Sequence, residues 1–307
     1  MRLLVVGAGS TGGYFGGRLA QAGRDVTFLL RPRRAAQLQE GGLQIVSPHG
    51  DVTVTPKLVT ANDLDGRYDA VLLAVKAYSL AAAIDDFGAA IGPGTAIVPV
   101  LNGMRHLEIL EERFGKEAVA GGVCKVATTI DANGRIVQLA QFQELSYGER
   151  DGSVSRRMEE LDAFMKGAGF DARLSRSIEY EMWEKWTLLA TIGGITCLMR
   201  GNIGEVVAAP GGASFILSFL DEVVSVVSTV GEAPKPAFLE EARKTLTTPG
   251  STQSPSIFRD LQQGSPIEAD QIIGDLIERG GKAGIATPLL AAAYAHTSVY
   301  QRRLAKS

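Results

Sequence analysis

The chain has 307 residues, of which 45% are hydrophobic and 21% are charged, and its formal net charge is −3. This composition is typical of a globular protein, and the length suits two domains of ordinary size. The slightly acidic balance excludes a basic field for nucleic acid or an anionic membrane, so neither is expected as a partner.

The first predicted element is a short apolar strand, residues 3–6, that leads directly into Gly-x-Gly-x-x-Gly. A helix to Ala22-Gly23 and a second strand over residues 25–30 complete a βαβ unit of the Rossmann kind. The N–H groups and the dipole at the start of such a helix favour a phosphate. The residues expected to bind the pyrophosphate of a dinucleotide are Gly7, Ala8, Gly9, Ser10, Thr11 and Gly12.

The second strand ends at Arg31, where an NAD enzyme would carry an acidic residue for the ribose hydroxyls. A cation at this position suits a 2′-phosphate, which predicts NADPH as the cofactor. The alternative is that Arg31 is an ordinary exposed loop residue and that the glycines serve only packing.

A polar helix (33–39) and a hairpin (43–47 and 52–55) are predicted next. Two further buried strands, 69–75 and 96–101, each end in a polar residue. These residues are Lys76 and Asn102. Ligands of open α/β sheets bind outside the carboxyl ends of the strands, so the two residues are expected in one neighbourhood. Their alternatives are a surface lysine and a turn asparagine.

The strands predicted between residues 118 and 148 are expected to continue the same sheet in the antiparallel sense, because their links are short. Residues 170–174 are expected to form an edge strand. Cys124 and Cys197 lie far apart in apolar surroundings and predict buried, reduced thiols of a cytoplasmic protein, with no metal site.

From residue 177 onward the hydrophobic periodicity is almost wholly helical. The predicted fold class is therefore α/β, with an N-terminal Rossmann dinucleotide-binding domain (1–175) followed by an all-helical C-terminal domain (176–307). The helices are expected over residues 178–200, 211–230, 235–246, 256–263, 267–282 and 288–303. Asp221-Glu222 interrupts the apolar run 213–230, which predicts a core helix too short and too polar to cross a membrane.

A hydride donated to a carbonyl carbon leaves an alkoxide, which needs a proton or a fixed positive charge. None of the three histidines is a convincing donor. Lys185 lies between aromatic residues on the apolar helix 178–200, and a lysine so placed can act as a general acid. The alternative is a snorkelling lysine paired with Glu181, four residues earlier.

Several motifs together resemble the ketopantoate reductase (2-dehydropantoate 2-reductase) family, in order along the whole chain. They are the glycine motif, Ala74-Val-Lys-Ala77, Asn102-Gly-Met104, Trp183-x-Lys185 and the segment from Ser256 to Glu268. The resemblance implies a Rossmann domain and a helical domain with the active site in the cleft between them.

The resemblance also implies the roles of individual residues. Lys185 would protonate the substrate oxygen, Glu268 would hold and tune that lysine, Asn102 and Ser256 would contact the substrate or the nicotinamide, Lys76 would lie near the cofactor ribose, and Arg31 would bind the 2′-phosphate.

The resemblance has gaps in the substrate site. Family members carry asparagines four and eight residues after the lysine, where this chain has Leu189 and Gly193, and Gln253 stands where another asparagine is expected. The first hypothesis is NADPH-dependent reduction of 2-dehydropantoate to pantoate in pantothenate biosynthesis. The alternatives are reduction of a less polar 2-oxo acid and a non-catalytic NADPH-binding sensor. The expected partner is a small 2-oxo acid, and a homodimer is left open.

Overall fold

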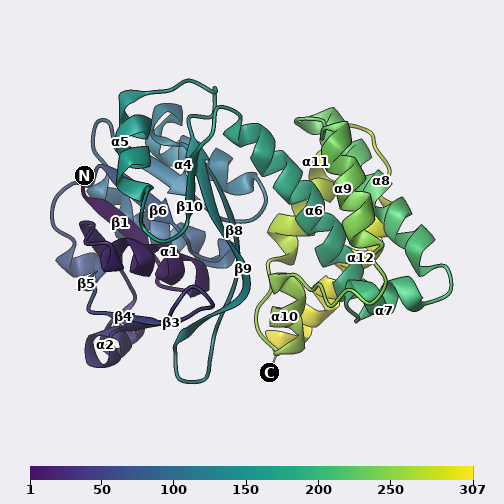
Figure 1. The fold of residues 1–307 in the computed structure, drawn as a ribbon. Coiled ribbons are helices and arrows are strands. Elements are labelled where there is room, and N and C mark those ends of the chain that lie inside the picture. The colour runs from purple at the N-terminus through teal and green to yellow at the C-terminus, as the bar shows by residue number, and fades with distance from the viewer. Residues whose placement is uncertain (307) are drawn as a thin grey trace. The chain divides into compact units, whose positions relative to one another are not determined.

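The computed structural model describes residues 1–306 and divides into two compact units (Figure 1). Unit 1 consists of Met1–Leu101 and His106–Glu179, and unit 2 of Asn102–Arg105 and Tyr180–Ser307. Unit 1 contains the strands, and unit 2 is helical. The α/β fold class with a Rossmann-type unit followed by a helical unit is confirmed.

Unit 1 combines ten strands with helices. The strands are β1 (Leu3–Val6), β2 (Val26–Leu29), β3 (Leu43–Val46), β4 (Val52–Val54), β5 (Lys57–Val59), β6 (Ala70–Leu73), β7 (Ala96–Pro99), β8 (Gly121–Ile130), β9 (Ile136–Gly148) and β10 (Asp171–Leu174). The α-helices of this part of the chain are α1 (Ser10–Gln21), α2 (Pro32–Gly41), α3 (Leu80–Phe87), α4 (Arg105–Phe114) and α5 (Arg156–Met165).

The strands form two sheets. The first is wholly parallel in the order β5-β2-β1-β6-β7, and the strands β1, β2, β6 and β7 are buried throughout, as parallel strands covered on both faces must be. The second has the order β10-β9-β3-β4, with β8 pairing antiparallel to β9. The antiparallel sense of β8 and β9 was predicted correctly. Their expected place in the first sheet is wrong, because β9 instead pairs with the hairpin strand β3 and with β10.

Helix α1 contacts strands of both sheets, and its glycines allow the close approach. A Cβ at Gly16 would lie 2.7 Å from the ring of Phe28 on β2. A Cβ at Gly13 would lie 2.4 Å from the side chain of Ile136 on β9, in the second sheet. The helix that starts at the glycine motif is therefore fixed on two faces by close packing.

Unit 2 is a set of helices around the long helix α6. Its helices are α6 (Ile178–Met199), α7 (Ile203–Ala208), α8 (Gly212–Val230), α9 (Pro236–Leu246), α10 (Ser256–Gln262), α11 (Asp275–Lys282) and α12 (Pro288–Leu304). A π-helical segment, Asp270–Gly274, runs directly into α11. The predicted helix over 267–282 is thus expanded by a π turn, a feature that often marks a functional region.

Helix α8 is the one helix of the described residues that is long and apolar enough to cross a membrane by length and composition, with a window of mean hydropathy 1.6. The expectation that it is too short and too polar is wrong by those criteria. The helix nevertheless contacts α7, α9, α11 and α12. The carboxylate of Glu222 also accepts hydrogen bonds from the N–H groups of Leu289 and Leu290 at 3.1 and 2.8 Å, at the start of α12. About 33% of its apolar window is buried, so α8 packs against unit 2 along one side and is not the enclosed core helix that was expected.

The two cysteines differ in burial. Cys197 on α6 is fully buried, whereas Cys124 on β8 is only half-buried, so the expectation of two buried thiols is correct for Cys197 alone. Neither forms a disulfide within the described chain.

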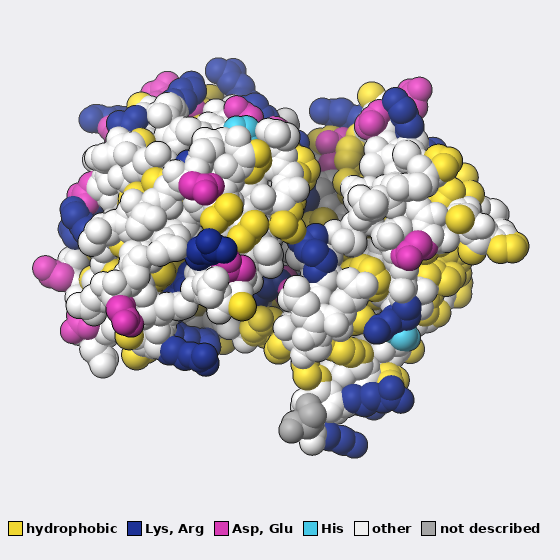
Figure 2. Space-filling model, turned by 60° about the horizontal axis from the view of Figure 1, so that its bottom comes forward, with side chains coloured by type: hydrophobic (Ala, Val, Ile, Leu, Met, Phe, Trp, Pro, Cys, Tyr) yellow, Lys and Arg dark blue, Asp and Glu magenta, His cyan; other side chains and the backbone are white. Residues whose placement is uncertain are grey.

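On the face shown in Figure 2, basic and acidic side chains are interspersed.

Candidate active site

The glycine motif forms the turn between β1 and α1. Gly7 has φ +95°, in the left-handed region, and its N–H donates to the carbonyl oxygen of Leu29 at 3.1 Å. A Cβ at Gly12 would lie 2.2 Å from the carbonyl oxygen of Gly7, so α1 can start this close to β1 only with glycine there. At Gly9, no described atom lies within 4 Å of a Cβ, so the backbone is open on that side. The turn is closed toward the sheet and open where a phosphate would approach.

The start of α1 is suited to an anion by its backbone. Gly9 is the N-cap residue, and within the described chain no side chain caps the helix and no acidic residue lies in its first turn. The first N–H groups of a helix have no partner inside it, and here they belong to Ser10, Thr11 and Gly12. These residues fit the phosphates of a dinucleotide.

The start of α2 carries three arginines. Arg31 is the N-cap residue and is exposed, and the first turn of this described helix contains no acidic residue. Cations at a helix N-terminus are opposed by the helix dipole. Arg31, Arg33 and Arg34 therefore create a local positive field that a bound anion would relieve.

Arg34 belongs to this cluster, and sequence reasoning assigned it no separate role. Its Nε donates to the carbonyl oxygen of Ala8 at 3.2 Å, and one terminal nitrogen donates to that of Gly134 at 3.1 Å. Burial lowers the pKa of this guanidinium. The residue thus ties the glycine turn to the turn between β8 and β9. The only signal in the sequence was the run Arg31-Pro-Arg-Arg34 after a strand.

Lys76 and Asn102 follow neighbouring strands. Strands β6 and β7 pair in parallel with Leu73 opposite Pro99, so the chain leaves both at the same edge. Lys76 is half-buried and precedes a short 3-10 turn in unit 1. Asn102 groups with unit 2, together with Gly103, Met104 and Arg105.

Helix α6 carries Lys185. Lys185 is half-buried, and the next residue, Trp186, is 1% exposed. The indole Nε1 of Trp186 donates to the carbonyl oxygen of Ile272 at 3.0 Å, in the π segment. Glu268, which is 3% exposed, lies two residues before that segment. The helix that carries Lys185 is therefore bonded to the stretch that begins at Glu268.

The same stretch meets two other predicted elements. A Cβ at Gly193 on α6 would lie 4.0 Å from Ile272 of that stretch and 3.0 Å from Ile257, the residue after Ser256 at the start of α10. A Cβ at Gly103 would lie 2.6 Å from the carbonyl oxygen of Gln271, in the π segment. Unit 2 thus gathers the elements that carry Lys185, Ser256, Glu268 and Asn102 around one π turn.

Gln253 lies in the segment before α10. Its carbonyl oxygen accepts a hydrogen bond from the N–H of Ile203 at 3.3 Å, which fixes the backbone against the start of α7. Its side-chain Oε1 is buried and has no hydrogen-bond partner among residues 1–306. A buried amide oxygen without a partner is costly, and a ligand donor would satisfy it.

The position of the second missing asparagine is filled by apolar packing. Gly193 is buried, and the side chains of Ile257 and Ile272 lie 3.0 and 4.0 Å from a Cβ built there. A longer side chain would require both isoleucines to move. Together with Leu189, this makes one wall of the region around α6 less polar than the family pattern predicts.

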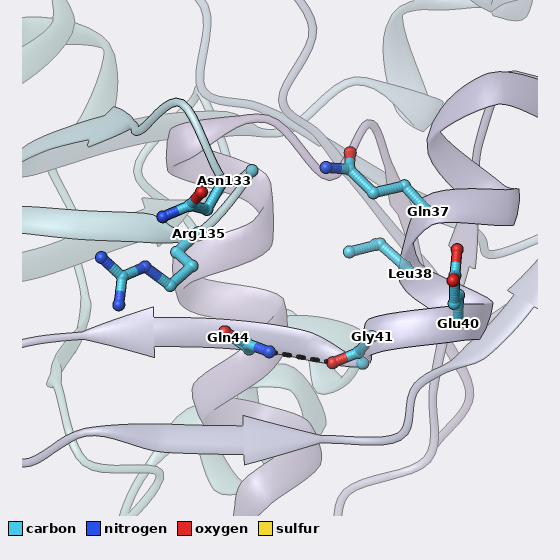
Figure 3. A pocket seen from close by; sticks show the side chains of 9 residues that line it. Gln37, Leu38, Glu40, Gly41, Gln44, Asn133 and Arg135 are labelled. Carbon is cyan, nitrogen blue, oxygen red and sulfur yellow. Dashed lines mark hydrogen bonds between the residues drawn. The ribbon is translucent and has the colours of Figure 1, made fainter.

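A separate cavity of about 280 Å³ lies in unit 1 between α2, β3 and the β8–β9 turn (Figure 3). Gln37 and Leu38 point toward that turn, and Gln44 donates to the carbonyl oxygen of Gly41 at 3.1 Å. Its described lining includes none of the predicted site residues. Within residues 1–306, no cluster of three or more His, Cys, Asp or Glu side chains is placed to hold a metal ion.

Comparison with known families matches both units. The family model of ketopantoate reductase PanE/ApbA matches residues 3–152, and the model of the ketopantoate reductase PanE/ApbA C terminal matches residues 177–301.

Individual relatives match over nearly the full length. An uncharacterized oxidoreductase, YkpB of Bacillus subtilis, is 36% identical over 98% of this chain and 99% of its own length. A 2-dehydropantoate 2-reductase of Mesorhizobium japonicum is 26% identical over 96% of both chains.

Solved structures share the fold. The 2-dehydropantoate 2-reductase of Geobacter metallireducens superposes with a TM-score of 0.86 at 26% identity, over 96% of this chain and 98% of that one. D-mandelate dehydrogenase in complex with NADH and anilino(oxo)acetate superposes with a TM-score of 0.88 at 21% identity, over 99% of this chain and 100% of that one.

Proposed function

Because the chain belongs to the ketopantoate reductase family, we propose that it is an NADPH-dependent oxidoreductase that reduces a 2-oxo acid to the 2-hydroxy acid. The first candidate reaction is 2-dehydropantoate to pantoate, in cytoplasmic pantothenate biosynthesis. The observation that carries the proposal is the presence of both Lys185 and Glu268 in a chain that matches the family over both units. A non-catalytic NADPH-binding sensor has no need of an acid and its partner, which places that alternative second.

The cofactor assignment is supported by the two helix starts of unit 1. The open turn at Gly9 and the N–H groups of α1 suit a pyrophosphate. Arg31, at the unbalanced positive start of α2, suits a 2′-phosphate and favours NADPH over NADH. When bound, NADPH supplies the hydride for the carbonyl carbon.

The proposed chemistry of the chain itself is proton delivery. Lys185 donates a proton to the substrate oxygen, where negative charge develops, and the Lys185 ammonium also stabilises that charge before transfer. Glu268 is almost fully buried, and its carboxylate holds Lys185 in orientation. Asn102, Ser256 and Gln253 contact the substrate with amide and hydroxyl groups.

We propose two candidate substrates, 2-dehydropantoate and a less polar 2-oxo acid, because of two residues on α6. Leu189 and the isoleucine-packed position Gly193 remove two amide donors from the expected binding site. A site without those donors cannot discriminate strongly for a substrate hydroxyl. A less polar 2-oxo acid is therefore the second candidate, and D-mandelate dehydrogenase, with the same fold, binds anilino(oxo)acetate.

The test is an NADPH-oxidation assay with purified protein across a panel of 2-oxo acids. The panel contains 2-dehydropantoate, its analogue without the hydroxyl, and aliphatic and aromatic 2-oxo acids. We expect turnover that depends on Lys185, with the variant Lys185→Ala as the control. Tight NADPH binding without turnover of any member of the panel would support the sensor instead.

A homodimer is the proposed assembly. The ketopantoate reductase of Staphylococcus aureus, which has the same fold at a TM-score of 0.82, is dimeric. Light scattering after gel filtration measures the mass directly, and a monomer at assay concentration would refute this part of the proposal.

A further inference from the structure

The residues Asn102–Arg105 belong to unit 2, although the chain on either side of them belongs to unit 1. Two contacts hold this segment, which we call the Asn102 loop, against the helix that follows Glu268. The first is backbone packing, because Gly103, at φ +81°, lies so close to Gln271 that a Cβ would be 2.6 Å from its carbonyl oxygen. The second is an ion pair between Arg105 and Asp275.

The ion pair is built around a buried carboxylate. The side chain of Asp275 is 3% exposed, and its Oδ1 accepts hydrogen bonds from Arg105 Nε at 3.3 Å and from Arg105 Nη2 at 3.1 Å. Arg105 also bonds Glu278, one turn further along α11. A second cation, Arg279, places its Nε 3.2 Å from the same Oδ1.

A buried carboxylate is unfavourable unless cations and hydrogen bonds compensate it. Arg105 comes from a position 170 residues earlier in the chain to do so. Two bonds to one carboxylate oxygen and one to Glu278 restrict both the position and the rotation of the guanidinium. The end of the Asn102 loop is therefore fixed on α11, three residues after Asn102 and seven residues after Glu268.

We propose that Arg105 and Asp275 are a positioning pair. The pair keeps Asn102 at a fixed position relative to Glu268 in the catalytic region of unit 2. This inference rests on the proposed function, since the role of Asn102 toward the substrate or the nicotinamide is part of that proposal. Arg105 acts through Asn102 and does not itself touch the substrate.

A first experiment tests whether the Arg105–Asp275 pair holds the Asn102 loop against α11, and it needs no activity measurement. We call this attachment of the loop the clamp. Hydrogen–deuterium exchange of the cofactor-free protein is followed in peptides covering the Asn102 loop and in peptides of α8. We expect Arg105→Met and Asp275→Asn each to speed exchange in the Asn102 loop at least tenfold, with α8 unchanged. Exchange in the loop that stays at the wild-type rate in both variants overturns the clamp.

A second experiment tests the role in catalysis by a double-mutant cycle. We expect Arg105→Met to lower kcat/KM for the 2-oxo acid by about ten- to a hundredfold, and Arg105→Lys, which keeps the charge but not the forked geometry, to recover part of the loss. In an Asn102→Ala background, Arg105→Met should cause no further loss. Losses that multiply in the double variant overturn the positioning role, even if the loop exchanges faster.

The matched control is Arg243→Met. Arg243 pairs with Asp221 at 2.5 Å, and its side chain is 42% exposed against 36% for Arg105, but its partner carboxylate is 58% exposed. We expect the control to leave kcat/KM within about twofold of wild type.

If wild type reduces no 2-oxo acid while the exchange result holds, the proposed function fails and the clamp stands. A loss in the control equal to that of Arg105→Met overturns a specific role for the pair.

Discussion

The indole nitrogen of Trp186 donates a hydrogen bond to the carbonyl oxygen of Ile272 at 3.0 Å. Trp186 directly follows Lys185 on α6, and Ile272 lies four residues after Glu268, inside the π segment. The bond therefore joins the helix of the proposed acid to the π segment that begins two residues after its proposed partner. Because Trp186 is 1% exposed, no water replaces the bond when it is lost.

The variant Trp186→Phe tests this bond. It keeps an aromatic side chain but leaves the Ile272 carbonyl oxygen without that donor, so the free energy of unfolding should fall by about 1–3 kcal/mol. We also expect kcat to fall, because the orientation of α6 against the π segment becomes less defined. Denaturant unfolding and steady-state kinetics measure the two effects. Trp183→Phe on the preceding turn is the control, and equal loss of kcat in both variants would contradict a specific role for the bond.

Cofactor preference tests Arg31. A charge-assisted contact to the 2′-phosphate contributes roughly 1.5–3 kcal/mol, or about one to two decades in affinity. Arg31→Ala should weaken NADPH binding by that factor and leave the Kd for NADH nearly unchanged. Arg33→Ala, an exposed arginine two residues further along α2, is the matched control. Equal Kd values of the wild-type protein for NADPH and NADH would refute the assignment.

The βαβ start was predictable because each of its steps is local. The apolar run, the glycines and the cation at the end of the second strand are contiguous in the sequence, and β1, α1 and β2 lie within a few residues of their expected bounds. The second sheet was not predictable in this way. Its β3–β9 pairing joins Ile45 to Ile136, and short links reveal the sense of a pairing but not the third strand beside it.

The candidate site shows the same limit. Lys185 and Glu268 could be named from motifs, whereas the Arg105–Asp275 pair joins two ordinary charged residues far apart in the chain. The π turn between Glu268 and Asp275 also has no signature in the hydrophobic periodicity, which reads as one continuous helix over 267–282. Tertiary packing, and not local propensity, decides both features.

Gly193 offers a test of packing. Gly193→Asn should lower the free energy of unfolding by about 1–3 kcal/mol, because the added side chain must displace Ile257 and Ile272. In an Ile257→Ala background the same substitution should cost less, since space has been made. Gly281→Ala on α11 is the control, because no described atom lies within 4 Å of its Cβ, and it should be neutral or stabilising by up to about 1 kcal/mol. Equal costs of Gly193→Asn in both backgrounds would contradict the packing explanation.

Cys197 predicts a pH dependence of stability. Burial raises the pKa of its thiol from 9.0 to about 12. The folded state therefore keeps the proton that the unfolded chain releases, and the stabilisation present below pH 9 is lost as the pH rises toward 12. Between pH 8 and 10, the wild-type protein should lose about 1.4 kcal/mol more unfolding free energy than Cys197→Ala. Parallel pH profiles of the two proteins would contradict the burial of a neutral thiol.

The proposed acid and its partner give the sharpest prediction. Lys185→Ala should leave the Kd for NADPH nearly intact and lower kcat by roughly 10²–10⁴, the usual contribution of a positioned general acid. Glu268→Ala should act on the same step. Because the two residues work as a unit, the double variant should be little worse than the poorer single variant, whereas independent roles would make the losses multiply.

A matched lysine variant provides a second readout for the same pair. Lys235→Ala is the control. The Nζ of this lysine lies 4.3 Å from the centre of the Tyr180 ring, and the residue has no proposed part in the reaction. Near-normal kcat in Lys185→Ala would remove the residue from the mechanism and bring the NADPH-binding sensor forward as the better account of the fold.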